Sequence, residues 1–147
     1  MTKWTVPLMV VAVLLLALRA GAGDGKKLTP HDLVGVYQIT AGEHAGKAIP
    51  AKELQVDRVS FTEEAITVVD KSAKKVYAAT YKLDGAKEPA HIHMVSIEPK
   101  KGQAAEGLIR RQGDTVTVIY ALPGGAAPTD FKTQEKQQMF TLQKVAK

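Results

Sequence analysis

The sequence contains no cysteine and no asparagine, and aromatic residues make up only 5% of it. Without cysteine the domain has no disulfide, so its stability must come from packing alone. The missing thiol also excludes a cysteine nucleophile and a lipid anchor attached to cysteine. Without asparagine there is no N-glycosylation acceptor, and tight turns must use glycine, aspartate and proline. The scarcity of aromatic residues argues against a large aromatic cage.

Several catalytic motifs are missing as well. The only serines are Ser60, Ser72 and Ser96, and none lies in a Gly-x-Ser-x-Gly elbow. No glycine-rich phosphate loop precedes an expected helix. The neighbouring carboxylates Glu63 and Glu64 lie at an expected turn, where solvent exposure is the simpler interpretation than an acid–base pair. We therefore expect neither enzymatic activity nor a cofactor.

The first 22 residues have the pattern of a secretion signal. Lys3 gives a basic start, residues 6–18 are almost entirely apolar, and Ala20-Gly21-Ala22 supplies small residues for cleavage. The apolar run is shorter than the about 20 residues that a membrane-spanning helix needs. We expect cleavage after Ala22, export to the periplasm or the medium, and a mature domain of residues 23–147 without an integral membrane segment.

The net charge is modest. The chain carries +5, and removal of Lys3 and Arg19 with the signal would leave +3, which is too little to indicate a nucleic-acid partner. Basic clusters occur at Lys71, Lys74 and Lys75, at Lys100-Lys101 and at Arg110-Arg111. Each cluster lies near an expected turn, so protection of strand edges is the main interpretation. A joint site for an anionic partner is the alternative.

The remaining sequence alternates apolar and polar residues in short runs that are separated by turn signals. The expected strands are 34–41, 57–61, 65–69, 75–83, 91–97, 104–111, 115–122 and 138–145. Short helical turns are expected at 30–33 and 50–54, and a turn at 42–46. Evenly spaced short strands predict an all-β, eight-stranded antiparallel up-and-down barrel. Because closure removes the sheet edges, we expect a monomer.

Several short motifs follow one another in a fixed order. They are Leu33-Val34-Gly35-Val36-Tyr37, Gly46-Lys47-Ala48-Ile49-Pro50, Thr80-Tyr81-Lys82-Leu83-Asp84, Gly107-Leu108-Ile109, Gly113-Asp114-Thr115-Val116 and Pro128-Thr129-Asp130-Phe131. With this set the chain resembles a family of small exported lipocalin-like proteins of unknown function that is abundant in planctomycete bacteria. Tyr37 stands where that family usually has tryptophan, Ala127 where it has arginine, and His93 where aspartate is common. The resemblance implies the barrel fold and brings no activity with it.

The resemblance also implies roles for three residues at the closed end of the barrel. Gly35 would permit close approach of the preceding helical turn, and Tyr37 would fill the base of the barrel, where its hydroxyl needs a partner. Lys144 on the last strand would cover that ring.

The expected barrel interior contains Phe61, Tyr81, Met94, Tyr120 and Phe140. A hollow interior would favour binding of a small apolar ligand, or of a macromolecular partner through the loops. If these side chains fill the barrel, the alternative is a structural or envelope-stress protein without a ligand.

His91 and His93 are the candidate metal ligands. They are two residues apart on an expected strand, so both imidazoles point to the same side and could chelate zinc or copper. A site needs a third ligand, for which His44, Glu43 and Glu98 are candidates. The apolar alternates Ile92 and Met94 place the histidines toward solvent, which favours a role without metal.

Overall fold

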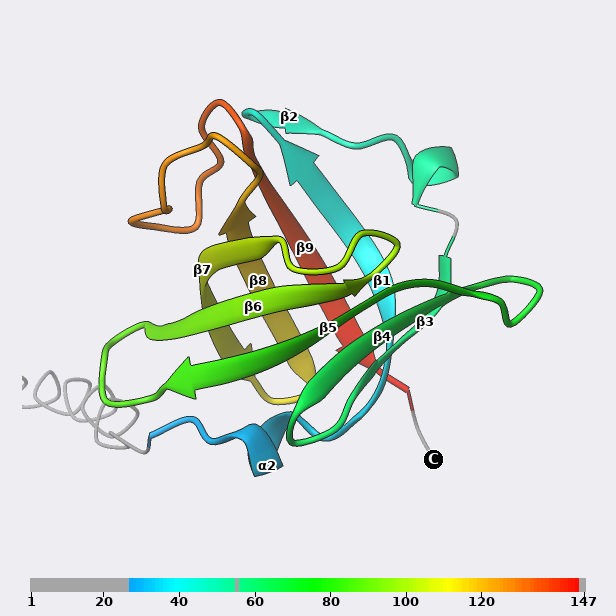
Figure 1. Ribbon diagram of the computed structural model, residues 1–147, viewed down its shortest axis with the longest axis horizontal. Helices are drawn as coiled ribbons and strands as arrows, with labels where there is room; N and C mark the ends of the chain where they lie inside the picture. Colours follow the sequence, from blue (N-terminus) through cyan, green and yellow to red (C-terminus); the bar gives the residue numbers. More distant parts are fainter. Residues whose placement is uncertain (1–26, 55, 146–147) are drawn as a thin grey trace, which may run out of the picture.

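The computed structural model describes residues 27–54 and 56–145 (Figure 1). The expected signal segment, residues 1–22, lies outside this part of the chain. The elements in chain order are α2 (Pro30–Leu33), β1 (Gly35–His44), β2 (Lys47–Ala48), the 3-10 turn η2 (Ala51–Glu53), β3 (Val56–Phe61), β4 (Ala65–Asp70), β5 (Lys75–Asp84), β6 (Ala90–Glu98), β7 (Ala104–Gln112), β8 (Thr115–Ala121) and β9 (Gln137–Lys144).

Eight of the strands close into an antiparallel barrel, as the alternating pattern predicts. Each strand from β3 to β9 pairs with the next in sequence, β1 pairs with β3, and β1 also pairs with β9. β2 adds a short ninth strand on β1. The fold prediction is confirmed, and so are the two short helical turns, which the structure places at α2 and η2.

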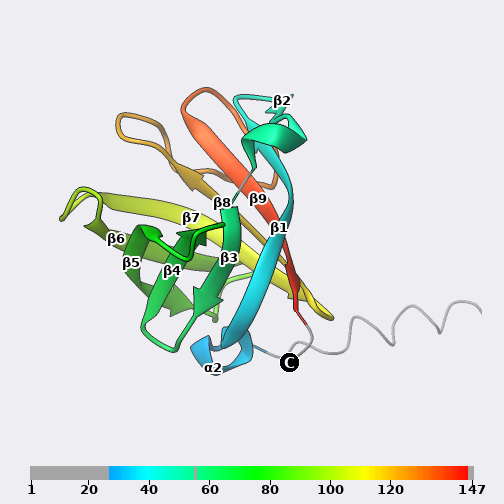
Figure 2. The same cartoon turned by 90° about the vertical axis from the view of Figure 1, so that its right-hand side faces the viewer.

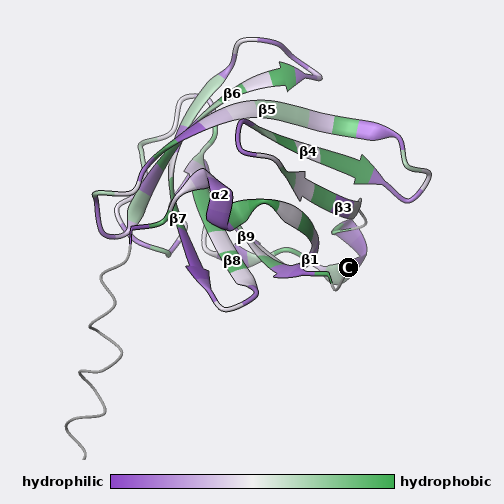
Figure 3. Ribbon diagram, turned by 90° about the horizontal axis from the view of Figure 1, so that it is seen from below, coloured by the Kyte–Doolittle hydropathy of each residue, from purple (hydrophilic) through white to green (hydrophobic). Residues whose placement is uncertain are grey.

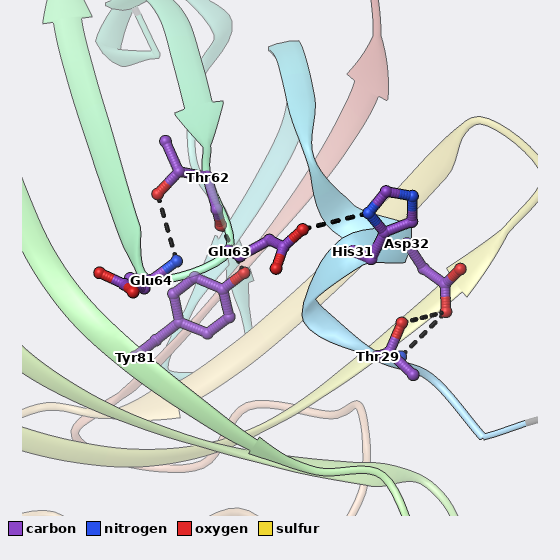
Figure 4. A network of polar contacts seen from close by, with 7 residues as sticks. All are labelled: Thr29, His31, Asp32, Thr62, Glu63, Glu64 and Tyr81. Carbon is purple, nitrogen blue, oxygen red and sulfur yellow. Dashed lines mark hydrogen bonds and ion pairs between the residues drawn. The ribbon is translucent and has the colours of Figure 1, made fainter.

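The helical turn α2 begins at a capping arrangement that the sequence encodes locally. Thr29 is the N-cap and Pro30 occupies the first turn, where its missing N–H costs no hydrogen bond. The Asp32 carboxylate accepts hydrogen bonds from the Thr29 backbone N–H, at 2.9 Å, and from the Thr29 hydroxyl, at 3.0 Å. Figure 4 shows this pair beside the turn. The cap fixes where α2 begins.

The predicted turn at 42–46 is wrong in its extent. β1 continues through His44, because its second half pairs with β9 from Ala41 to His44. A register shift between Ile39 and Ala41 interrupts the alternation, so the period-two pattern ends before the strand does. The actual turn is Ala45-Gly46, with φ of 47° and 83°, and β2 follows at once.

The two ends of the barrel differ. α2 and the β3–β4, β5–β6 and β7–β8 turns lie at one end, and η2 with the β4–β5, β6–β7 and β8–β9 connections lie at the other. Figures 1 and 2 show α2 at the bottom and β2 at the top in both views. Seen from below, α2 lies across the bottom end (Figure 3). We call the end that carries α2 the closed end and the opposite one the open end.

A second packed region lies outside the barrel. The β8–β9 connection, residues 122–136, folds back toward β7 and β8 (Figure 1, orange). Phe131 of this loop stacks under the Arg110 guanidinium at 4.2 Å from the ring centroid. Leu108 and its partner Ile119 are both buried, yet neither belongs to the main core cluster. The loop therefore covers an apolar outer face, which explains why β8 is buried on both sides.

Candidate functional site

The closed end is held together by polar contacts at its surface. His31 in α2 lies 3.1 Å from the Glu63 carboxylate in the β3–β4 turn, and both side chains are exposed. The Thr62 hydroxyl accepts hydrogen bonds from the backbone N–H groups of Glu64, at 3.2 Å, and Ala65, at 3.0 Å. Figure 4 shows the His31–Glu63 pair together with the Thr62–Glu64 contact. An exposed ion pair contributes little stability, so their main effect is to position α2 against the turn.

Three aromatic rings fill the closed half of the barrel. Tyr37 and Phe61 meet edge to face with ring centroids 5.5 Å apart, and Phe61 meets Tyr81 in the same way at 5.8 Å. The Tyr37 hydroxyl donates to the Leu33 carbonyl oxygen at 2.8 Å, and the Tyr81 hydroxyl donates to that of Thr62 at 2.7 Å. Both hydroxyl groups thus have a backbone partner, and the three rings form a packed group in this half of the barrel.

Gly35, Tyr37 and Lys144 come together beside this aromatic group. Tyr37 is 1% exposed and pairs across the barrel seam with Lys144. A Cβ at Gly35 would lie 2.7 Å from the Lys144 Cε atom, and the Gly35 φ of 151° is one that other residues rarely adopt. The lysine stem therefore lies where only glycine leaves space for it.

The open half contains a cavity of about 270 Å³. Its fourteen lining residues come from η2, Leu54 and all barrel strands except β7, and Glu53 is the one charged residue among them. Of the five interior candidates, Phe61, Met94, Tyr120 and Phe140 lie on this wall, whereas Tyr81 belongs to the aromatic group of the closed half. The barrel is thus filled at one end and hollow at the other.

The mouth of the cavity lies where the barrel wall separates. β1 and β3 pair only from Gly35 to Tyr37, and beyond this point β1 pairs with β2 instead. η2 and Leu54 occupy the gap, and Leu54 packs against Gly42 of β1. Glu53 and Val76 line the cavity and are exposed to solvent, so the cavity opens between η2 and the β4–β5 hairpin.

Two tyrosines supply the polar groups within the cavity. The Tyr120 hydroxyl donates to Gln138 Oε1 at 3.0 Å. Burial raises the pKa of Tyr120, with the nearby Tyr77 adding to it, and burial also raises the pKa of Tyr77. Within residues 27–54 and 56–145, no hydrogen bond joins the Tyr77 hydroxyl to another group. Both phenols stay neutral at physiological pH, and Tyr77 is available to a bound molecule.

The size of the cavity limits what it can hold. A cavity of about 150 Å³ accommodates benzene, and sites for drug-sized molecules begin at about 300 Å³. The 270 Å³ found here lies between these values. It fits a molecule somewhat larger than a single aromatic ring, with an apolar body and at most a few polar atoms.

Two other hollows differ from this cavity in their walls. One, of about 330 Å³, lies at the closed end between Lys27, Lys87, Arg110 and Arg111. The other, of about 610 Å³, lies within the β8–β9 loop and is lined by polar and small residues such as Thr129, Gln134 and Gly125. Both are larger, but their walls are largely polar or charged, so they suit an apolar molecule less well than the barrel cavity does.

His91 and His93 point outward from β6 and are exposed. His93 Nδ1 contacts the carboxylate of Glu106, its cross-strand neighbour on β7. Of the proposed third ligands, Glu43 instead accepts two hydrogen bonds from Thr133 in the β8–β9 loop. In the described part of the chain, no group of three or more histidine, cysteine, aspartate or glutamate side chains is arranged to hold a metal ion.

The sequence pattern misses several cavity residues. Ile39, Tyr77 and Val118 line the cavity but are not among the five interior candidates, because nothing in the alternation separates the filled half from the hollow one. Glu53 ends the short turn η2 and Leu54 follows it. This segment carries no periodic signal, yet the two residues lie at the mouth of the cavity. Their position depends on the divergence of β1 from β3, a tertiary feature.

Comparisons of the chain with protein-family models, with curated proteins and with solved structures return no match. Within residues 27–54 and 56–145, no helix has the length and apolar character needed to cross a bilayer. What the barrel can bind therefore follows from its own geometry.

Proposed function

We propose that this protein is a binding protein that holds a small apolar molecule in the open half of its barrel. The observation that carries this proposal is the 270 Å³ cavity with an apolar wall and an open mouth. Apolar side chains on seven strands would bury most of such a molecule, and each Å² of buried apolar surface contributes about 25 cal/mol. The free Tyr77 hydroxyl would bind one polar atom of the ligand.

The proposal includes export, a monomeric state and a role without catalysis. The signal pattern at residues 1–22 supports export, and the closed barrel supports the monomer, because its main sheet leaves no long edge for another copy. The family resemblance agrees with export, and membership of the planctomycete-type family is part of the proposal.

A filled structural barrel is the second candidate function. The packed group of Tyr37, Phe61 and Tyr81 favours it, because this group makes half of the barrel a rigid core. The two candidates differ in the open half: a ligand carrier needs that cavity, whereas a structural protein would tolerate its being filled.

A cavity-filling variant tests the difference. Val118→Phe on β8 places a ring into the cavity, and Val68→Phe on the opposite wall does the same from β4. We expect both to lower the affinity for an apolar fluorescent probe at least tenfold. Val36→Phe is the matched control, because Val36 is exposed on the outside of β1. Equal probe affinity in all three variants would contradict binding in the cavity.

Native mass spectrometry of protein purified gently from its own host would identify the ligand. A retained small molecule, lost in Val118→Phe but kept in Val36→Phe, is the expected result. A probe that fails to bind, together with a mass equal to that of the chain alone, would favour the structural candidate.

A further inference from the structure

Charge is distributed unequally between the two ends of the barrel. The described connections at the open end, residues 45–54, 71–74, 99–103 and 122–136, carry eight lysines and three acidic residues. The lysines are Lys47, Lys52, Lys71, Lys74, Lys100, Lys101, Lys132 and Lys136, and the acidic residues are Glu53, Asp130 and Glu135. These connections therefore carry a net charge of +5, which Glu43, Asp70 and Glu98 at the adjoining strand ends partly offset.

The connections at the closed end carry the opposite net charge, which Arg110 and Arg111 at the adjoining end of β7 partly offset. Its described connections, residues 27–34, 62–64, 85–89 and 113–114, contain two lysines and five acidic residues. These are Lys27 and Lys87 against Asp32, Glu63, Glu64, Glu88 and Asp114, a net charge of −3. The molecule thus has an electrostatic polarity along the barrel, and an anionic surface would orient it with the open end forward.

Two lysine clusters that are separate in the sequence lie on neighbouring hairpins at this end. Ala78 of β5 pairs with Glu98 of β6, so the turn at 71–74 and the turn at 99–103 project from neighbouring hairpins on the same side. Figure 3 shows hydrophilic residues at the tip between β4 and β5. The third basic cluster does not join them, because Arg110 stacks on Phe131 and Arg111 lies toward the β7–β8 turn.

Exposed apolar side chains accompany the lysines. Val76, directly after Lys75, is 39% exposed, and Ile97 on the neighbouring strand is 41% exposed. Val76 also lines the mouth of the cavity. Lysines together with a few exposed apolar residues form the pattern by which proteins bind the interface of an anionic bilayer.

We propose that the open end docks on an anionic lipid bilayer, so that the mouth of the cavity faces the membrane. This inference rests on the proposed ligand binding and gives it a direction: the apolar molecule passes between the bilayer and the barrel without crossing water. The chemistry favours lipid over a nucleic acid or phosphoprotein. Every basic residue in the described open-end connections is a lysine, which attracts charge diffusely, whereas specific phosphate recognition commonly uses the guanidinium fork of arginine.

Sedimentation with vesicles tests the docking. Protein is purified as its host processes it and mixed with vesicles of pure phosphatidylcholine or of phosphatidylcholine with phosphatidylglycerol. We expect strong binding to the anionic vesicles at low ionic strength and a steep loss as salt is added. An apolar N-terminal segment, if retained, would bind both vesicle types alike, so the difference between them reports the lysines.

Two triple variants, each of which removes three positive charges, show which part of the barrel binds the vesicles. Lys71→Gln, Lys74→Gln and Lys75→Gln together remove three exposed lysines at the open end, and we expect the vesicle partition coefficient to fall about a hundredfold, since each lysine near an anionic surface contributes about fivefold. Lys27→Gln, Lys82→Gln and Lys87→Gln remove three exposed lysines elsewhere and should cost far less. Equal losses in the two variants would overturn the orientation.

The apolar probe separates this inference from the proposed function. In solution, both triple variants should bind the probe as the unmodified protein does, because no lysine lines the cavity. Probe binding without vesicle binding would overturn the docking alone. Failure to bind the probe in every form of the protein would overturn the ligand proposal, whatever the vesicles show.

Discussion

The Tyr37 hydroxyl donates a 2.8 Å hydrogen bond to the backbone carbonyl of Leu33, four residues earlier in the chain. Leu33 ends α2 and is completely buried, and Tyr37 belongs to the aromatic group that fills the closed half. The bond therefore ties the turn that lies across the closed end to the ring beneath it. Neither residue lines the cavity, although Phe61, which Tyr37 contacts, does.

Tyr37→Phe should destabilise the protein without changing what it binds. The substitution keeps the ring contacts but removes the partner of a buried carbonyl, which costs about 1–3 kcal/mol in the free energy of unfolding. Urea denaturation measures the loss, and the affinity for the apolar probe should stay the same.

Tyr77→Phe is the matched control, because the Tyr77 hydroxyl bonds to no group within the described chain. Its effect on the free energy of unfolding should stay within about 0.5 kcal/mol. Equal destabilisation by the two substitutions would show that the Leu33 contact has no special value.

Thr133 should anchor the loop that covers the outer face of β7 and β8. Its hydroxyl donates to the Glu43 carboxylate at 2.7 Å and accepts from the Gly46 backbone N–H at 2.7 Å, and the residue is 5% exposed. Thr133→Val keeps the shape but removes both bonds, so we expect a loss of about 1–3 kcal/mol and faster proteolysis within residues 122–136.

The exposed Thr129 offers a control for this loop. Thr129→Val makes the same chemical change where the side chain is open to solvent, and it should leave both stability and proteolysis nearly unchanged. Cleavage at the same rate in both variants would mean that the Glu43 contact does not hold the loop in place.

The barrel could be predicted from the sequence because the signals for it are local. Alternation identifies all eight barrel strands, and Thr29-Pro30 identifies the helical turn before β1. The extent of β1 could not be predicted, since the register shift after Ile39 moves the alternation to the other face while pairing with β9 continues.

The hollow half of the barrel depends on tertiary packing. Phe61 and Met94 have the same inward pattern as Tyr81, yet they line the cavity and Tyr81 does not. Tyr81 pairs directly with Met94, so the two lie at the same level of the barrel, and the packing of the surrounding side chains decides which of them borders the cavity. The burial of Ile119 has the same origin: a loop with no periodic pattern covers an outward position.

Export predicts a specific mass for the purified protein. Full-length chain expressed in its own host should be recovered outside the cytoplasm as residues 23–147, with cleavage after Ala22. Ala22→Trp should block this cleavage, because the site needs small residues, whereas Ala17→Leu in the apolar run should leave it intact. Intact-mass measurement of the secreted and cell-associated fractions shows whether cleavage occurs after Ala22. Recovery of an exported chain that keeps residues 1–22 would contradict the prediction.

The four tyrosines should make the fold sensitive to alkaline pH. Burial raises the pKa of Tyr81 to about 12, with Glu63 and Tyr37 adding to it, and burial also raises the pKa of Tyr37, Tyr77 and Tyr120. In the unfolded chain these phenols ionise near pH 10. Above that pH the unfolded chain loses protons that the folded chain retains, so the free energy of unfolding should be constant up to about pH 9 and then fall through pH 12. Phenolate absorbance should rise at a higher pH in the folded protein than in urea.

Tyr81→Phe tests the contribution of one tyrosine to this decline. The variant should be less stable at neutral pH, because it loses the hydrogen bond to Thr62, but its stability should fall less steeply at alkaline pH. An unchanged decline would contradict the assignment to Tyr81.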